Sequence, residues 1–316
     1  GLFILVFLFS LIFISLFIFF FFHKSSPNNS SSFFWLSKET SIIINNWFMM
    51  YFLSVVLIGT IYPIFLEVLS SQKISVGPPF YHKLIIPFLI PFLIAMAIGP
   101  KLKWIKSNIV DKFYLVLFFA ISIVLSFLIV KKFSTNLLIN TILVSSALYL
   151  FFITLRDFFI RKYSNISQNI AHFGFSLLIL SILLNNLFSS EIITNLKVGE
   201  TFTSSKTKIV FKSINQKQEK NYKSIIANFS IENINQKIED LSPELRIYNQ
   251  PNIVTSEADI KTTLLLDKFI VINIVQNQDY FNVRYQVKPF MLWIWISVIL
   301  ISFGGLLSFF KREHEK

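Results

Sequence analysis

Seven long apolar stretches, separated by short polar segments, run along most of the chain. Nearly all reach the roughly 18 to 20 residues that a helix needs to cross about 30 Å of hydrocarbon, and they predict seven transmembrane helices. Their ranges are 1–22, 44–66, 84–98, 113–130, 137–155, 170–188 and 290–310. The third is the weakest, because it is short and contains Pro87 and Pro91, which remove backbone donors and bend a helix.

The pattern changes between the sixth and seventh stretches, over residues 191–288. Apolar runs shorten, and several alternate with polar residues, as in half-buried β-strands. The runs are TKIVFKSI, YKSIIANFSIE, PELRIYN, KFIVINIV and YFNVRYQV. A disordered segment would lack such β-branched and aromatic runs. We therefore expect a compact antiparallel β domain that is held at both ends by helices.

The expected fold class is a polytopic α-helical membrane protein with about seven transmembrane helices and one extracytoplasmic all-β domain between the last two. The expected domains are a six-helix transmembrane region (1–189), the β domain (190–289), and a final helix with its tail (290–316).

Composition and charge support this interpretation. Hydrophobic residues make up 54% of the chain and charged residues only 15%, far from the usual soluble composition. The net charge of +12 mostly reflects basic loops. Twelve Lys and Arg residues fall on one side of the predicted spans and four in short loops on the other, which places the first side in the cytoplasm and residues 191–288 outside. No nucleic-acid partner is expected. The chain has no cysteine, which excludes a disulfide, a thiolate metal site and a redox CxxC motif.

One histidine, His172, lies inside a predicted span. The other three lie at span ends or outside the spans: His23, His82 and His314. Ionisable side chains within a membrane are costly and usually functional. A neutral imidazole is a standard axial ligand of haem iron, but His172 is equally compatible with a buried histidine bonded to a carbonyl group.

The helix around His172 has two distinct sides. A stripe of small or polar residues at helical spacing predicts close packing against another helix; it consists of Ser167, Ala171, Gly174, Ser181 and Asn185. Gln168, His172 and Ser176 share a neighbouring face that can surround the imidazole with polar groups.

Three other segments have plain structural explanations beside functional ones. SKETSIIINNW (37–47) is compatible with a capped helix entry, although Asn45 and Asn46 are unusual inside a span. The loop 57–83, with Gly77-Pro78-Pro79, could shape a groove at the outer membrane face or be a plain connector. Glu244 and Arg246 could form a cross-strand ion pair.

No nucleotide-binding or hydrolase motif is visible, and the spans lack the buried charges typical of an ion pathway.

Six segments in order resemble the cytochrome c maturation haem lyases of the CcmF family over nearly the whole chain. SKETSIIINN resembles its Ser-Arg-Glu…Asn-Asn motif, with Lys38 in place of Arg. The others are GTIYPIFLE, ISVGPPFYHK, ISQNIAHFGFS, LSPELRIYNQ and VRYQVKPFMLWIWIS.

The resemblance implies that His172 is an axial ligand of the iron of a membrane-embedded haem b, with the second ligand outside this chain. It implies a haem lyase component, or holocytochrome c synthase, that helps attach substrate haem to the CxxCH motif of apocytochrome c; no catalytic residue is identified. The implied partners are a haem chaperone, apocytochrome c, a thiol-reducing maturation subunit and membrane lipid.

The family's Trp-rich periplasmic segment and its other histidine ligands are absent from this sequence. We therefore expect either the C-terminal part of a split lyase or a truncated piece of a longer lyase. Without the missing N-terminal lyase portion, this part should be inactive. The expected location is a bacterial inner membrane with a periplasmic β domain, with a mitochondrial inner membrane as the alternative. The resemblance does not separate the general lyase from its nitrite-reductase-dedicated relative. A transporter subunit and a non-catalytic assembly scaffold are competing hypotheses.

Overall fold

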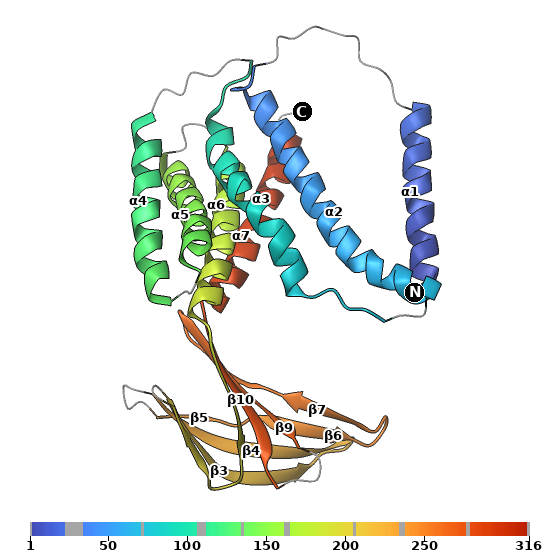
Figure 1. Ribbon diagram of the computed structural model, residues 1–316, viewed down its shortest axis with the longest axis vertical. Helices are drawn as coiled ribbons and strands as arrows, with labels where there is room; N and C mark the ends of the chain where they lie inside the picture. The colour runs from blue at the N-terminus through green and yellow to red at the C-terminus, as the bar shows by residue number, and fades with distance from the viewer. Residues whose placement is uncertain are drawn as a thin grey trace. The chain divides into compact units, whose positions relative to one another are not determined.

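The computed structural model describes residues 2–22, 34–70, 73–105, 112–133, 136–160, 165–204, 207–233, 238–275 and 279–314. Within these ranges, seven helices are long and apolar enough to cross a membrane, as the apolar pattern predicts (Figure 1). They are α1 (Leu2–Phe22), α2 (Lys38–Ser70), α3 (Pro78–Ile98), α4 (Lys112–Phe133), α5 (Leu137–Ile160), α6 (Ile166–Phe188) and α7 (Met291–His314). The expected polytopic helical fold is confirmed. His23 lies outside the described residues.

Two helices extend well beyond the apolar runs that predict them. Helix α2 passes through Pro63 and ends only at Ser70. Helix α3 begins at Pro78, with Gly77 as its extended N-cap and proline in its first turn, a position where the missing N–H of proline costs nothing. The segment 57–83 is therefore mostly helical, because both helices extend into the connection expected between residues 66 and 84.

The chain forms two compact units, Gly1–Asn169 and Ile170–Lys316. In the first unit, α5 packs against both α3 and α4, and α2 packs against α3. Aromatic rings fill the contact between α2 and α3. The ring centroids of Tyr51 and Phe88 lie 4.1 Å apart, and the Tyr51 hydroxyl donates to the Leu84 carbonyl at 2.9 Å. Phe92 packs edge-on against Phe48 and Phe52.

The second unit contains the β domain, in which every strand pairing in the described residues is antiparallel. One sheet has the order β1-β10-β9-β8, and the other has β2-β3-β4-β6-β7 with β5 against β4. The strands are β1 (Ser190–Leu196), β2 (Thr201–Thr203), β3 (Thr207–Gln218), β4 (Tyr222–Asn233), β5 (Ile238–Leu241), β6 (Glu244–Tyr248), β7 (Ile253–Glu257), β8 (Asp259–Thr262), β9 (Leu266–Ile274) and β10 (Phe281–Pro289). All five predicted strand segments form strands.

The core of this domain lies between the two sheets. Fully buried apolar side chains on alternate positions meet there, among them the stacked rings of Phe211 and Phe229, with centroids 4.4 Å apart. A bulge between Phe211 and Ser213 shifts the register of β3 against β4. The Tyr285 hydroxyl is buried in this core without a hydrogen-bond partner among the described residues, and burial raises its pKa to about 12.

Helices α6 and α7 are joined at the base of the β domain. The strands that continue from them, β1 and β10, pair directly, with Ser190 opposite Val287. The Asn185 amide donates to the Pro289 carbonyl at 2.5 Å, and the rings of Phe188 and Phe290 lie 6.4 Å apart. Both connections to the β domain are therefore short and held by contacts.

Candidate functional site

Helix α6 carries His172 on its seventh residue, about 9 Å along the axis from its first residue. The side chain is half-buried. The helix forms here because Leu, Ile and Phe dominate the sequence, and its backbone groups must bond internally in an apolar environment.

One side of α6 packs closely against α7. A Cβ added to Gly174 would lie 3.0 Å from the backbone N of Ile301 and from the Leu300 side chain. Ser181, two turns further on, is buried, and Asn185 on the same side bonds to Pro289. The stripe of small residues thus has the helix-packing role that its spacing predicts.

His172 lies on the other side of α6. It precedes Gly174 by two residues, a rotation of about 200° around the helix axis, so it points away from the contact with α7. Ser176, one turn further on, is fully buried, and its hydroxyl donates to the Phe173 carbonyl at 2.8 Å. The His172 side of the helix therefore lies opposite the contact with α7, but at Ser176 it is buried as well.

His172 offers a single nitrogen ligand. Within the described ranges, no group of three or more His, Cys, Asp or Glu residues could hold a metal ion. His82, on α3 of the first unit, is exposed. A lone imidazole suits a group that brings most of its own ligands, as a porphyrin does for iron.

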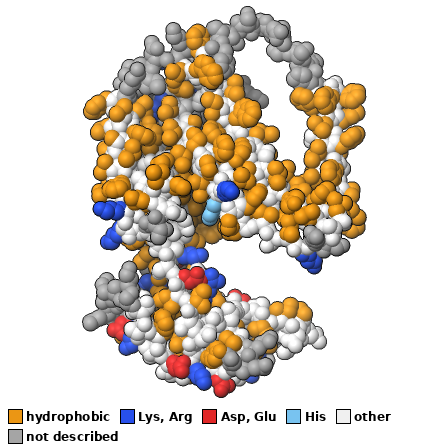
Figure 2. Space-filling view, viewed as in Figure 1, with side chains coloured by type: hydrophobic (Ala, Val, Ile, Leu, Met, Phe, Trp, Pro, Cys, Tyr) orange, Lys and Arg blue, Asp and Glu red, His pale blue; other side chains and the backbone are white. Residues whose placement is uncertain are grey.

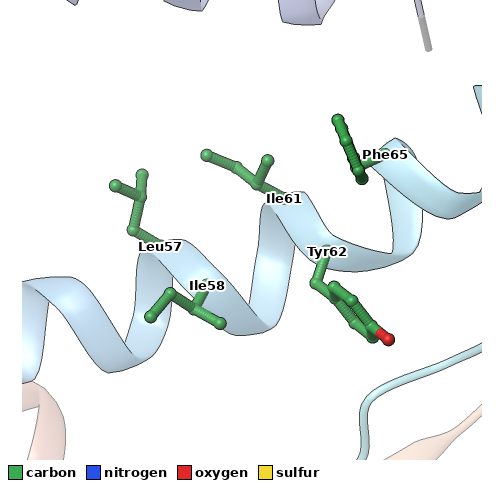
Figure 3. Close-up of a pocket in the computed structure, with 5 residues that line it drawn as sticks. All are labelled: Leu57, Ile58, Ile61, Tyr62 and Phe65. Carbon is green, nitrogen blue, oxygen red and sulfur yellow. The ribbon is translucent and has the colours of Figure 1, made fainter.

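The two segments of α2 and α3 with family-like motifs contact each other. A Cβ on Gly59 of GTIYP would lie 2.6 Å from the Tyr81 hydroxyl of GPPFYHK. Only glycine lets the Tyr81 ring approach this closely. On α2 itself, an open apolar groove of about 240 Å³ is lined by Leu57, Ile58, Ile61, Tyr62 and Phe65. Figure 3 shows these side chains along successive turns of the helix.

The start of α2 is a capped helix entry. The Thr40 N–H donates to the Ser37 hydroxyl oxygen at 3.2 Å, the standard N-cap bond. The Glu39 carboxylate accepts the Ile105 N–H at 3.0 Å, and the Lys38 N–H donates to the Lys103 carbonyl at 2.9 Å. The segment SKET therefore fixes the chain that follows α3. Asn45 and Asn46, the unusual polar residues of this span, are exposed.

A buried charge cluster lies near the ends of α3 and α5, just outside the predicted spans 84–98 and 137–155. Lys101 and Asp157 form an ion pair with side chains 2% and 13% exposed. The Arg156 guanidinium lies 3.7 Å from the centroid of the Tyr114 ring. The predicted spans themselves contain no charged side chain, but α5 continues past residue 155 to Ile160 and so carries Arg156 and Asp157. An Arg-Asp pair directly after an apolar run was the available signal. Its position at helix ends favours a structural role.

The motif PELRIY forms β6 of the sandwich. Arg246 donates to Glu244 of its own strand at 3.1 Å and approaches Glu257 of β7 at 3.9 Å. Leu245 points the other way, into the core. The expected ion pair between Glu244 and Arg246 exists, but within one strand, and only the contact with Glu257 crosses strands.

The fold and these sites define a class: a multi-pass membrane protein whose last two helices carry a β-sandwich between them. Comparisons with known proteins narrow it. The family model described as "CcmF C-terminal beta-sandwich" matches residues 187–289. A solved structure titled "Cytochrome c Heme Lyase CcmF" has the same fold, with a TM-score of 0.67 and 18% identity over 86% of this chain and 46% of that one.

Curated relatives point to the same proteins as the family model and the solved structure. The cytochrome c-type biogenesis protein CcmF of Pseudomonas fluorescens is 27% identical over 83% of this chain and 42% of its own length. CcmF of Escherichia coli strain K12 is 24% identical over the same shares, and NrfE of Haemophilus influenzae is 24% identical over 82% and 42%. This chain is thus similar to CcmF proteins over most of its length, and its residues 187–289 match the C-terminal β-sandwich of that family. It spans less than half the length of these relatives.

Proposed function

We propose that this chain is the C-terminal part of a haem lyase, a holocytochrome c synthase that helps attach haem covalently to the CxxCH motif of apocytochrome c. Relatives that match most of the chain are cytochrome c-type biogenesis proteins, and a solved structure with this fold is titled as a haem lyase. The observation within the chain that carries the proposal is the half-buried His172 on a membrane-spanning helix.

His172 would be the axial ligand of the iron of a membrane-embedded haem b. Its single nitrogen suits a group with its own equatorial ligands, and it lies about 200° around the helix axis from Gly174, the residue that packs against α7. The second axial ligand would come from outside this chain. When bound, this haem would supply electrons that keep the iron of the substrate haem reduced, or structural support.

The remaining parts of the chain would bind and orient. The residues 1–189 would form a six-helix membrane region and residues 290–316 a final helix with its tail, with the β domain at 190–289 in the periplasm. Docking of apocytochrome c, a haem chaperone or a thiol-reducing maturation subunit would use the β domain, whose strands β6 and β7 carry the charged side chains of Glu244, Arg246 and Glu257. The bacterial relatives favour a bacterial inner membrane over a mitochondrial one.

The test is a haem spectrum of the chain co-expressed with the N-terminal part of a bacterial CcmF. His172→Ala should abolish the b-type band in the reduced-minus-oxidised spectrum. His82→Ala, a second histidine that is exposed on α3, should leave the band unchanged and serves as the matched control.

A rescue experiment separates ligation from packing. His172→Gly leaves space at the ligand position, and added imidazole should restore the band without restoring it in His172→Leu. An unchanged b-haem band in His172→Ala would overturn the assignment of this ligand. Loss of cytochrome c maturation in both histidine variants would point to a structural fault instead.

A further inference from the structure

The hairpin between β8 and β9 has an unusual tip. The turn residues 263–266 are Thr-Leu-Leu-Leu, where turns normally carry Gly, Asn, Asp, Ser or Pro. Leu264 is 73% exposed and Leu265 57% exposed. Their exposure is not a sign of a poorly formed turn, because the Thr263 N–H donates to the Leu266 carbonyl at 2.9 Å and the Leu266 N–H donates to the Thr263 hydroxyl oxygen at 3.1 Å. A well-formed turn thus presents adjacent leucines outward.

This tip is fastened to the first turn of α7. The Trp293 indole N–H donates to the Leu264 carbonyl at 2.9 Å. The Phe290 N–H donates to the Leu265 carbonyl at 2.8 Å, and Phe290 itself adopts a left-handed backbone conformation with φ of 62°. The leucines therefore lie at the level where the span Met291–Phe310 begins.

That level is the boundary between water and lipid. Tryptophan is enriched at this boundary because its ring is apolar and its N–H is polar, and Trp295, on the same turn as Trp293, is 64% exposed. An exposed apolar tip bonded to an interfacial tryptophan continues the apolar surface of the span. The interfacial region of a lipid bilayer can cover such an apolar surface without any protein partner.

We propose that the β8–β9 hairpin tip inserts Leu264 and Leu265 into the outer interface of the lipid bilayer. The tip is a third attachment of the β domain to the membrane, beside the connections to α6 and α7. It restrains the tilt of the sandwich about its two short connections. The proposal depends on the span of α7 and not on haem.

The absence of cysteine from the sequence makes a direct test simple. Single variants Leu264→Cys and Leu265→Cys are spin-labelled in the full chain and reconstituted into vesicles of phosphatidylcholine and phosphatidylglycerol. The matched control is Val198→Cys, an aliphatic residue that is 50% exposed in another turn of the same domain. It follows β1, which leads away from α6 for seven residues, roughly 25 Å of extended strand.

The measurement is the collision rate of each label with apolar oxygen and with a water-soluble nickel chelate. Labels at 264 and 265 should favour oxygen several-fold more than the label at 198. Equal preferences at all three positions would place the tip in water and overturn the proposal. Protection of the tip labels from both reagents would also overturn it, because a protein partner, not lipid, would then cover the leucines.

Discussion

The helical region and the β-sandwich contain the same apolar residue types, but the helices expose them at the surface and the sandwich buries them in its core. On α4, Phe113 is 80% exposed, whereas Phe229 on β4 is fully buried. Figure 2 shows apolar side chains covering the helices and charged side chains spread over the sandwich. The reason is the solvent: lipid accepts apolar surface, and water does not. Exposed leucines are thus unremarkable on the helices but informative at the tip of the β8–β9 hairpin.

The sharpest way to break this comparison is to make one substitution in both regions. Phe229→Ala removes a ring that stacks on Phe211 in the core of the sandwich, and should destabilise the domain by about 3–5 kcal/mol. Phe113→Ala should change stability by less than about 0.5 kcal/mol. Thermal unfolding of the detergent-solubilised chain, followed by circular dichroism, measures both. Equal losses would mean that Phe113 is covered by protein.

A second substitution tests whether the helical region has a polar interior of its own. Asp157→Ala removes the carboxylate that pairs with the buried Lys101 ammonium, and should cost about 3–5 kcal/mol. The control is Glu219→Ala in the sandwich, which breaks an ion pair with Lys217 of normal length, 2.7 Å, but high exposure. That variant should have the same melting temperature as the wild type. A similar melting shift for both would show that burial of the Lys101–Asp157 pair does not matter.

Two glycines in the helices of the second unit separate close packing from lipid exposure. Gly174→Val forces a side chain against the backbone of Ile301, and should cost about 1–3 kcal/mol. Gly305 has no atom within 4 Å of an added Cβ, so Gly305→Ala should be neutral or stabilise the helix by about 0.5–1 kcal/mol. The melting temperatures of both variants and the wild type, measured in detergent, test these two expectations. A stable Gly174→Val variant would contradict the observed packing of α6 on α7.

The smallest effect concerns pH and the base of the sandwich. Arg284 and Gln286 on β10 donate to Glu191 on β1 and lower its pKa below the ordinary value of 4.5. A carboxylate with a depressed pKa stabilises the folded state at neutral pH, and this contribution is lost as the pH falls through the folded-state pKa. The melting temperature of the wild type should therefore fall slightly more steeply below pH 4.5 than that of Glu191→Gln. Parallel curves would show that this exposed contact is unimportant.

The elements of this fold were largely predictable from local sequence. All seven apolar runs form helices and all five alternating runs form strands, because hydrophobic period and length are local properties. The shortest strands were missed: β2, for example, has three residues and too few positions to show alternation. The ends of α2 and α3 were also misjudged, because α2 continues past residue 66 to Ser70 and Pro78, expected in a loop, begins α3.

His172 as a haem ligand stays a prediction, and much of the packing around the helices could not be predicted from the sequence. His172 stood out because an imidazole within an apolar run is rare, and the spacing of Gly174, Ser181 and Asn185 correctly indicated a packed side. The buried pair Lys101–Asp157 was not foreseen, because its residues are 56 positions apart. Nor was the bond from Trp293 to Leu264, which joins residues 29 apart.

The sequence by itself determined which segments cross the membrane, which form the β domain, and which imidazole lies within a span. These are consequences of side-chain polarity along a short stretch of chain. Only the tertiary structure decided which charges pair in the interior, which glycine lies against α7, and that the leucines of one hairpin lie beside the first turn of a membrane helix. Such contacts depend on the packing of segments that are distant in sequence, and a local residue pattern does not reveal which distant segments will meet.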